Sequence, residues 1–215
     1  MQSSSTSLRV LCCALITLLV TVKNAPCSPF PVQNRNPPWF EPSPKEAPVL
    51  DVPKGCVNLA ANKPVTSSDR GGLVVGALNQ ITDGVKSWDA NACVEIGPDK
   101  QYVQIDLNTN AVIYAIRMWH YHSFVPDVDV PKDVVVQVAS DSTFTNSVGT
   151  VFNCDADNTL GLGQGNDMPF GTSKFGKTVY VNARPARFVR VYGRGSHLSP
   201  MTRFVEIEVD GVPSP

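Results

Sequence analysis

The strongest constraint on the fold is a series of short segments in which apolar and polar residues alternate or apolar residues dominate. These segments are YVQIDL (102–107), AVIYAIRMWHY (111–121), DVVVQVAS (133–140), TVYVNA (178–183), RFVRVYG (187–193) and RFVEIEVDG (203–211). Neighbouring side chains on a strand point to opposite faces, so a period of two predicts strands with one buried face.

Turn-forming residues separate these segments, as in SDSTFTNS and GLGQGND. Strands do not alternate with helical patterns, which argues against a parallel α/β sheet. Val, Thr, Ile and Gly are frequent from about residue 57 onward, whereas long runs of helix formers are few. We therefore expect an all-β domain, built as an antiparallel sandwich or barrel.

Charge and motifs exclude several function classes. The net charge is −1 and no basic run stands out, so nothing indicates a nucleic-acid partner. The chain has three histidines and contains no GxSxG, HExxH or Walker motif. The glycine-rich GLGQG (161–165) lacks the Lys-Ser/Thr of a phosphate loop. We expect a protein that is not an enzyme.

The N-terminus has the features of a secretory signal. Arg9 precedes the apolar stretch VLCCALITLLVTV (10–22), and small residues follow it. The alternative is a membrane anchor, but about 13 apolar residues are too few to span a hydrocarbon core of ~30 Å. We predict a signal peptide over residues 1–27, no membrane span, and a secreted, periplasmic or cell-envelope location.

A proline-rich segment follows. Residues 24–53 hold half of the 18 prolines in the chain. Repeated proline prevents helix formation and ladder pairing, so we predict a linker over residues 28–55 and one domain over residues 56–212. Trp39 and Phe40 could dock on that domain.

Export would permit disulfides among the remaining cysteines. Cys93 and Cys154 are the preferred pair because both lie in loop-like segments, although spacing alone leaves the connectivity open. No CxxC or Cys/His framework for structural zinc is present.

Two short stretches carry candidate chemistry. In MWHYH (118–122), His120 and His122 share one face of a strand, where they could be structural, contact a sugar or anion, or bind a transition metal. In the second stretch, FVEIEVDG, Glu206 and Glu208 share the polar face of the predicted strand. Charged residues on a solvent face are the default, and paired acid/base catalysis or calcium binding are alternatives.

The ordered set of segments resembles discoidin domains, also called coagulation factor 5/8 type C domains, whose bacterial members are grouped with carbohydrate-binding module family 32. The resemblance begins at CVNLAANKPVTSSD (56–69) and continues through ITDGVKSW, QYVQIDLNTNAVIYAIRMW and RFVRVYG to FVEIEVDG. It implies a galactose-binding-like jelly-roll β-sandwich of about eight antiparallel strands.

The resemblance also implies a structural calcium ion between an Asp-Gly turn and the last strand. Asp83 matches the family's turn aspartate, and Glu206 matches the glutamate of its closing strand. The backbone carbonyls of Leu78, Asn79 and Lys86 are the expected further ligands. The sequence departs from the family at Val85, where a second acid is common, and Trp88 follows the turn sooner than usual.

Ligands of this family bind to variable loops at one end of the sandwich. The candidate ligand-binding residues of this chain are His120, His122, Arg117, Phe124, Asn166, Phe170 and Arg203. Phe124, Phe170 and Tyr192 are candidate flat platforms for a sugar ring.

We therefore expect a secreted, non-catalytic module that recognises carbohydrate, such as a cell-surface glycan, and holds a structural calcium ion. The alternative is an adhesive or structural domain that contacts another envelope protein or anionic lipid and has no sugar site. A hydrolase that uses Glu206 and Glu208 is a third, less favoured hypothesis.

Overall fold

The computed structural model describes residues 39–72, 75–121 and 128–214. The predicted signal peptide and two candidate ligand residues, His122 and Phe124, lie outside these ranges. The elements are β1 (Val57–Asn58), β2 (Val65–Ser67), the 3₁₀ helices η1 (Leu78–Thr82) and η2 (Ala90–Ala92), β3 (Val94–Ile96), β4 (Gln101–His120), β5 (Val135–Ala139), β6 (Gly149–Asn153), β7 (Lys177–Gly193) and β8 (Thr202–Pro213). The predicted all-β class is confirmed.

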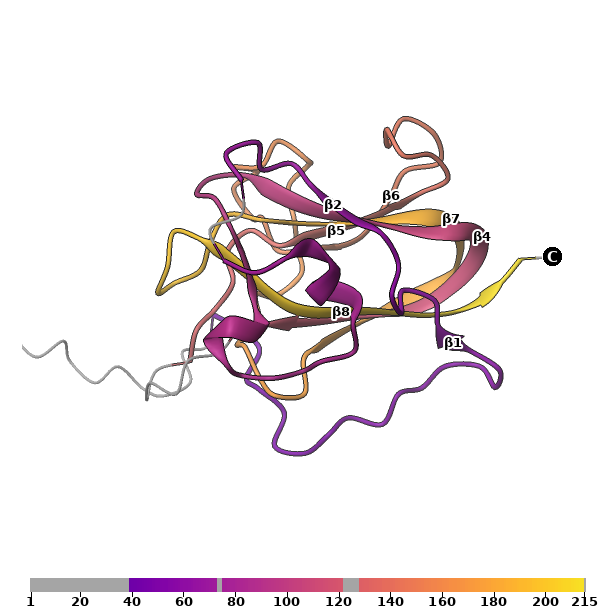
Figure 1. Ribbon diagram of the computed structural model, residues 1–215, viewed down its shortest axis with the longest axis horizontal. Helices are drawn as coiled ribbons and strands as arrows, with labels where there is room; N and C mark the ends of the chain where they lie inside the picture. Colours follow the sequence, from indigo (N-terminus) through magenta and orange to yellow (C-terminus); the bar gives the residue numbers. More distant parts are fainter. Residues whose placement is uncertain (1–38, 73–74, 122–127, 215) are drawn as a thin grey trace, which may run out of the picture. The chain divides into compact units, whose positions relative to one another are not determined.

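Every strand pair is antiparallel, in the order β1-β8-β4-β7-β5-β6, with β2 added to β4 and β3 to β8. The first half of β4 pairs with β2 and with the second half of β7, whereas its second half pairs with β8 and with the first half of β7. The two long strands therefore pass from one layer of a sandwich to the other (Figure 1).

Four of the strands expected from the sequence form only two strands of the structure, because β4 and β7 each continue from one layer to the other. The segments 102–107 and 111–121 are parts of β4, and 178–183 and 187–193 are parts of β7, with a register shift between Asp106 and Ala111. At this bend Asn108 has a φ of 63°, and its N–H donates to Asp106 Oδ1 at 2.8 Å. Asparagine tolerates this left-handed backbone, so the bend is a feature of the local sequence.

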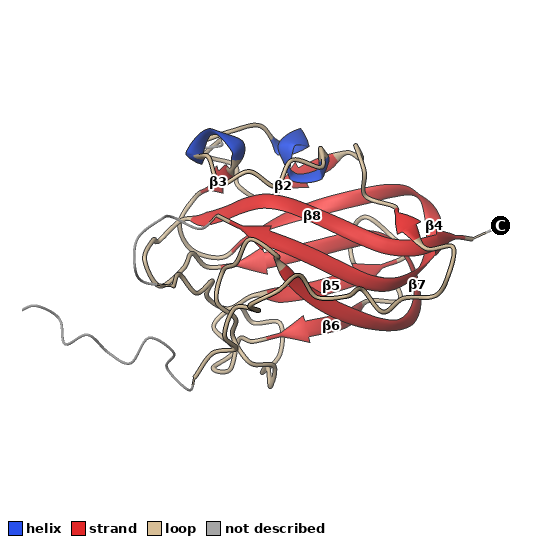
Figure 2. Cartoon of the chain, turned by 90° about the horizontal axis from the view of Figure 1, so that it is seen from below, coloured by secondary structure: helices blue, strands red, loops and turns tan. Residues whose placement is uncertain are grey.

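The core lies between the layers. Val103 and Ile105 of one layer, and Ile116, Met118 and Ile207 of the other, are fully buried in one cluster. Burial of each such side chain contributes about 1.5–3 kcal/mol. The loops between the strands gather at the ends of the sandwich, and the loop that joins β7 to β8 lies at the end opposite the C-terminus (Figures 1 and 2).

Part of the predicted linker lies against the domain. Phe40 is buried, and Glu41 forms a parallel bridge with Phe170, with Glu41 N–H donating to Pro169 O at 2.7 Å. Further along, Tyr180 Oη accepts from the N–H of Asp51 at 3.2 Å. Residues 39–51 therefore make fixed contacts with the sandwich.

The expected Cys93–Cys154 disulfide is wrong, because both cysteines are free. The Cys93 thiol donates to Ala90 O at 3.1 Å and packs with Trp119, whereas Cys154 Sγ accepts from the N–H of Val134 at 3.2 Å in the main core. The two thiols belong to different clusters, which the loop-like sequence around each could not reveal.

Candidate functional site

Glu206 is the most unusual group near the predicted metal site. Its side chain is 0% exposed, and its Oε2 accepts from the N–H of Gly84 at 3.0 Å. Its Oε1 is buried without a hydrogen-bond partner among the described residues. Burial raises the pKa of Glu206 to about 8, and the negative charges of Glu208 and Asp83 add to this effect.

The Asp-Gly turn brings Asp83 to this buried carboxylate. Helix η1 ends at Thr82, and the Asp83 carboxylate accepts from the N–H of Val85 at 2.8 Å, which closes an Asx turn. Gly84 has a φ of 85°, a conformation that glycine adopts without strain. The segment is therefore a tight turn that also places an exposed acid near Glu206.

Glu208 lies two residues further along β8 and has cations of its own. Lys86 Nζ lies 2.5 Å from Oε1, and the Arg117 guanidinium lies 2.7 Å from Oε2. Arg117 also forms two hydrogen bonds with Asp210, of 2.8 and 2.9 Å. Arg117, predicted to bind ligand, instead neutralises two buried acids of the closing strand.

The expectation that Glu206 and Glu208 face solvent is also wrong. Both side chains are buried, because the segment from η1 to Lys86 covers this face of β8. Such burial opposes a role as an exposed pair of catalytic carboxylates.

The residues present fit a divalent cation at Glu206. A buried carboxylate with one unpaired oxygen, next to a second carboxylate and a loop of carbonyl groups, is a set of hard oxygen donors. The ammonium of Lys86 is engaged by Glu208, so only its carbonyl suits a ligand role. The calcium assignment of Asp83, Glu206, Leu78, Asn79 and Lys86 stays a prediction.

Three other candidate ligand residues have structural partners. His120 is buried between Phe170 and Phe204, with ring centroids 5.7 and 5.1 Å away, and burial lowers the pKa of His120 to about 4. Phe170 is part of the core. Arg203 pairs with Glu95 and lies over the Tyr121 ring. His120 and Phe170 are therefore buried and Arg203 is engaged by Glu95, so the three do not form one exposed binding face, and their ligand-binding roles stay predictions.

Tyr192, a candidate platform, is also buried and packs edge-on against Tyr102. Asn166 is exposed and remains available to a ligand. A cavity of about 10 Å³ lies beside His120 and Trp119, close to the lower limit for one water molecule.

An aromatic surface lies at the loop end of the sandwich, and it includes Trp39, which the sequence placed in the linker and not among the ligand-binding candidates. Trp39 is 48% exposed, and its ring lies 6.0 Å from that of His197 and 5.1 Å from that of Phe40. The buried Phe40 and the Glu41–Phe170 bridge fix its backbone. We name Trp39, His197 and the neighbouring exposed Leu198 and Met168 the loop-end surface.

The loop-end surface unites segments far apart in sequence. The N–H of His197 donates to Val130 O at 2.9 Å, and that of Gly171 donates to Glu41 O at 3.1 Å. The segment before Gly171 and the loop that begins at His197, which hold the candidates Asn166, Phe170 and Arg203, thus lie beside the segment of Trp39. In the sequence, a tryptophan within the proline-rich segment is the feature that could have indicated this surface. Only the tertiary contacts show where the Trp39 ring lies.

One group of three acids has closely spaced oxygens: Asp133, Asp155 and Asp157. Both oxygens of the buried Asp155 accept backbone N–H groups, from Thr159 at 2.9 Å and Leu160 at 2.8 Å. Asp133 accepts from Arg194 at 2.7 Å. These bonds explain the cluster as an anchor for the loop after β6.

Comparisons of sequence find no family model that matches the chain and no curated protein that matches it. Among the described residues, no helix is long and apolar enough to cross a membrane.

Comparisons of structure do find similar proteins. A family 32 carbohydrate-binding module from Clostridium perfringens, solved with GlcNAc-α-1,4-galactose, has a TM-score of 0.51 and 17% identity, and the match covers 74% of this chain and 96% of that one. An F-lectin from striped bass (Morone saxatilis) serum has a TM-score of 0.51 and 16% identity, with 75% and 50% covered.

A family 89 glycoside hydrolase from Clostridium perfringens gives a TM-score of 0.53 at 16% identity, but the match covers only 15% of that chain and 74% of this one. The chain has the galactose-binding-like β-sandwich fold of discoidin-type domains.

Proposed function

We propose that this protein is a non-catalytic carbohydrate-binding module that holds sugar on the loop-end surface. The observation that supports this proposal most directly is the exposed ring of Trp39, which is fixed beside His197 although its own segment is rich in proline. A flat aromatic ring stacks on the apolar face of a sugar, and nearby polar groups bond to its hydroxyls. His197 and Asn166 are exposed polar side chains of the adjoining loops.

Affinity gel electrophoresis against neutral galactan and chitosan tests this proposal. We expect the full chain to be retarded by at least one of them, and Trp39→Ala to weaken binding by about 2 kcal/mol or more, as for a central aromatic contact. Trp39→Phe should retain part of the retardation, and Val49→Ala, at an exposed position of the same segment, should retain all of it. Equal retardation of wild type and Trp39→Ala would exclude this surface.

The exposed Leu198 and Met168 beside Trp39 also suit a protein contact, which is the alternative function. A pull-down from an envelope fraction tests it: capture of one partner by wild type and not by Trp39→Ala, without sugar retardation, would favour adhesion. The proposed location outside the cytoplasm follows from the signal-like N-terminus and is tested by fractionation of cells that express the full chain.

A structural calcium ion is the second part of the proposal. Asp83 and Glu206 would hold it with the carbonyls of Leu78, Asn79 and Lys86, and its charge would neutralise the buried carboxylate. A ligand that binds only the folded state raises the melting temperature. We expect calcium to raise it relative to chelator in wild type and not in Asp83→Ala. Identical melting of wild type in calcium and chelator would contradict the site.

A further inference from the structure

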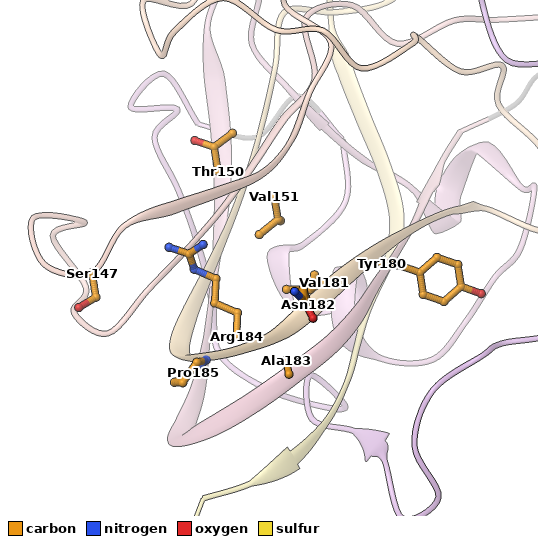
Figure 3. Close-up of a pocket in the computed structure, with 9 residues that line it drawn as sticks. All are labelled: Ser147, Thr150, Val151, Tyr180, Val181, Asn182, Ala183, Arg184 and Pro185. Atoms are coloured by element: carbon orange, nitrogen blue, oxygen red, sulfur yellow. The ribbon is translucent and has the colours of Figure 1, made fainter.

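A cleft of about 580 Å³ lies away from the loop-end surface, between β6 and the first half of β7 (Figure 3). It is lined by Ser147, Thr150, Val151, Tyr180, Val181, Asn182, Ala183, Arg184 and Pro185. The bends of β4 and β7 lie at the end of the sandwich near the C-terminus, opposite the loop between β7 and β8 (Figures 1 and 2). The volume is within the range of small-ligand sites.

The cleft exists because two sheet edges face each other without a strand between them. Among the described strands, β6 pairs only with β5, and residues 177–186 of β7 pair only with β4. Edge strands offer unpaired backbone groups to a ligand, or to another strand. Pro185 lies on this edge and has no N–H, which disfavours the addition of a peptide strand.

Arg184 supplies a positive charge to the cleft. Its side chain is half-buried and extends from β7 toward β6, whereas Tyr180 points away from it (Figure 3). Four other arginines are each paired with a carboxylate: Arg117, Arg187, Arg194 and Arg203. Within the described ranges, Arg184 has no ion pair or side-chain hydrogen bond, so its guanidinium donors are available to an anion.

The backbone of β6 makes room for this guanidinium. A Cβ atom on Gly149 would lie 2.0 Å from Arg184 Cζ and 2.2 Å from one of its terminal nitrogens. Glycine at the start of β6 therefore lets the guanidinium lie against the strand. The position of the charge depends on Gly149.

The loop that supplies Ser147 is held in place by its own contacts. Asp141 accepts from the backbone N–H groups of Thr143, Thr145 and Asn146. Arg190 lies over the Phe144 ring at 4.0 Å and donates to Ser142 O at 3.1 Å. This wall of the cleft is preorganised, which reduces the cost of ordering on binding.

We propose that the cleft is a second binding site, for a sugar residue that carries a carboxylate or sulfate group. Arg184 pairs with the anionic group in a forked, charge-assisted contact. Ser147 and Asn182 are exposed hydrogen-bonding residues of the lining, and Val151 and Pro185 provide apolar surface. The site is independent of Trp39 and of the calcium ion.

Calorimetric titration of the full chain tests this inference, with oligogalacturonate as the carboxylate probe and a sulfated galactan oligosaccharide as the sulfate probe. We expect one of them to bind, and Arg184→Gln to weaken its binding at least tenfold. Arg70→Gln is the matched control, because Arg70 is an exposed arginine without an acidic partner among the described residues. The control should bind as wild type does.

Gly149→Ala tests geometry at constant charge. The added methyl group displaces the guanidinium, so binding should fall several-fold while the protein stays folded, as judged by circular dichroism. Trp39→Ala should leave acidic-sugar binding unchanged, which separates this site from the loop-end surface. The inference is overturned if neither probe binds, if Arg184→Gln binds as wild type does, if Arg70→Gln is equally impaired, or if a peptide library binds the cleft in place of the sugars.

Discussion

Glu206 and Glu208 stand two residues apart on β8, and both are buried, yet their surroundings are opposite. Glu208 has Lys86 and Arg117 as ion-pair partners. Glu206 has one N–H donor, a pKa raised by burial, and an oxygen without a partner among the described residues. The Glu208 carboxylate is neutralised by cations of the chain, whereas the Glu206 carboxylate requires a proton or a bound cation.

The largest effect on stability is expected when Arg117, one of the two cations that neutralise Glu208, is removed. Arg117→Met leaves Glu208 and Asp210 buried with less compensation, so it should lower the free energy of unfolding by about 3–5 kcal/mol in urea titrations. The calcium-dependent rise in melting temperature should remain, because Glu206 is untouched. A loss below about 1 kcal/mol would show that solvent already screens this network.

His120 extends the comparison to a buried base that has no hydrogen-bond partner among the described residues. Its folded pKa of about 4 lies below the unfolded value of about 6.5, so the unfolded state binds more protons between these values. The contribution of His120 to stability should therefore fall by up to about 3 kcal/mol as the pH drops from 6.5 to 4, whereas the raised pKa of Glu206 contributes with the opposite sign. Urea titrations of wild type and His120→Phe across this range should show this contribution as the difference between the two proteins, because Glu206 is present in both.

Exchange of each glutamate for glutamine should give effects of opposite sign. In chelator at pH 7, the folded protein holds Glu206 mostly protonated because its pKa is about 8. Glu206→Gln removes the cost of taking up that proton on folding and should stabilise the protein by about 1–3 kcal/mol. Glu208→Gln breaks two ion pairs and should destabilise it by a similar amount. Only Glu206→Gln should abolish the response to calcium. Equal destabilisation by both changes would remove the distinction between the two sites.

The smallest effect is expected at an ion pair in contact with solvent. Arg187 forms two hydrogen bonds with Asp106 at the bend of β4, but their side chains are 40% and 27% exposed. Arg187→Ala should lower the stability least among these variants, and the loss should diminish in 0.5 M salt. A cost as large as that of Arg117→Met would mean that the bend, and not burial, determines the strength of these pairs.

Much of the fold could be predicted from the periodicity of the strands, because alternation on β4, β7 and β8 is a local property. The sequence predicts 102–107 and 111–121 as separate strands, because the residues between them interrupt the alternation, whereas β4 continues through the bend. The short β1, β2 and β3 carry too few residues for a periodic signal. Trp39 was assigned to a linker because its proline-rich neighbours give no sign of docking.

The site was harder to predict because side-chain roles depend on distant partners. Arg117, His120, Phe170 and Arg203 are residue types that suit ligands, but the sandwich uses them for ion pairs and packing. The sequence does not distinguish Arg184 from the other arginines, since its lack of an acidic partner among the described residues depends on where the acids lie in space.

The sequence by itself determined the all-β class, the alternation along the strands and the Asp83–Gly84 turn, because these depend on residues within a few positions of one another. The tertiary structure alone decided which acids are neutralised. Arg117 reaches Asp210 across 93 positions, and Lys86 reaches Glu208 across 122. Ion pairing and burial depend on distance in space. Two glutamates with nearly identical local sequence therefore differ in whether cations of the chain neutralise their carboxylates.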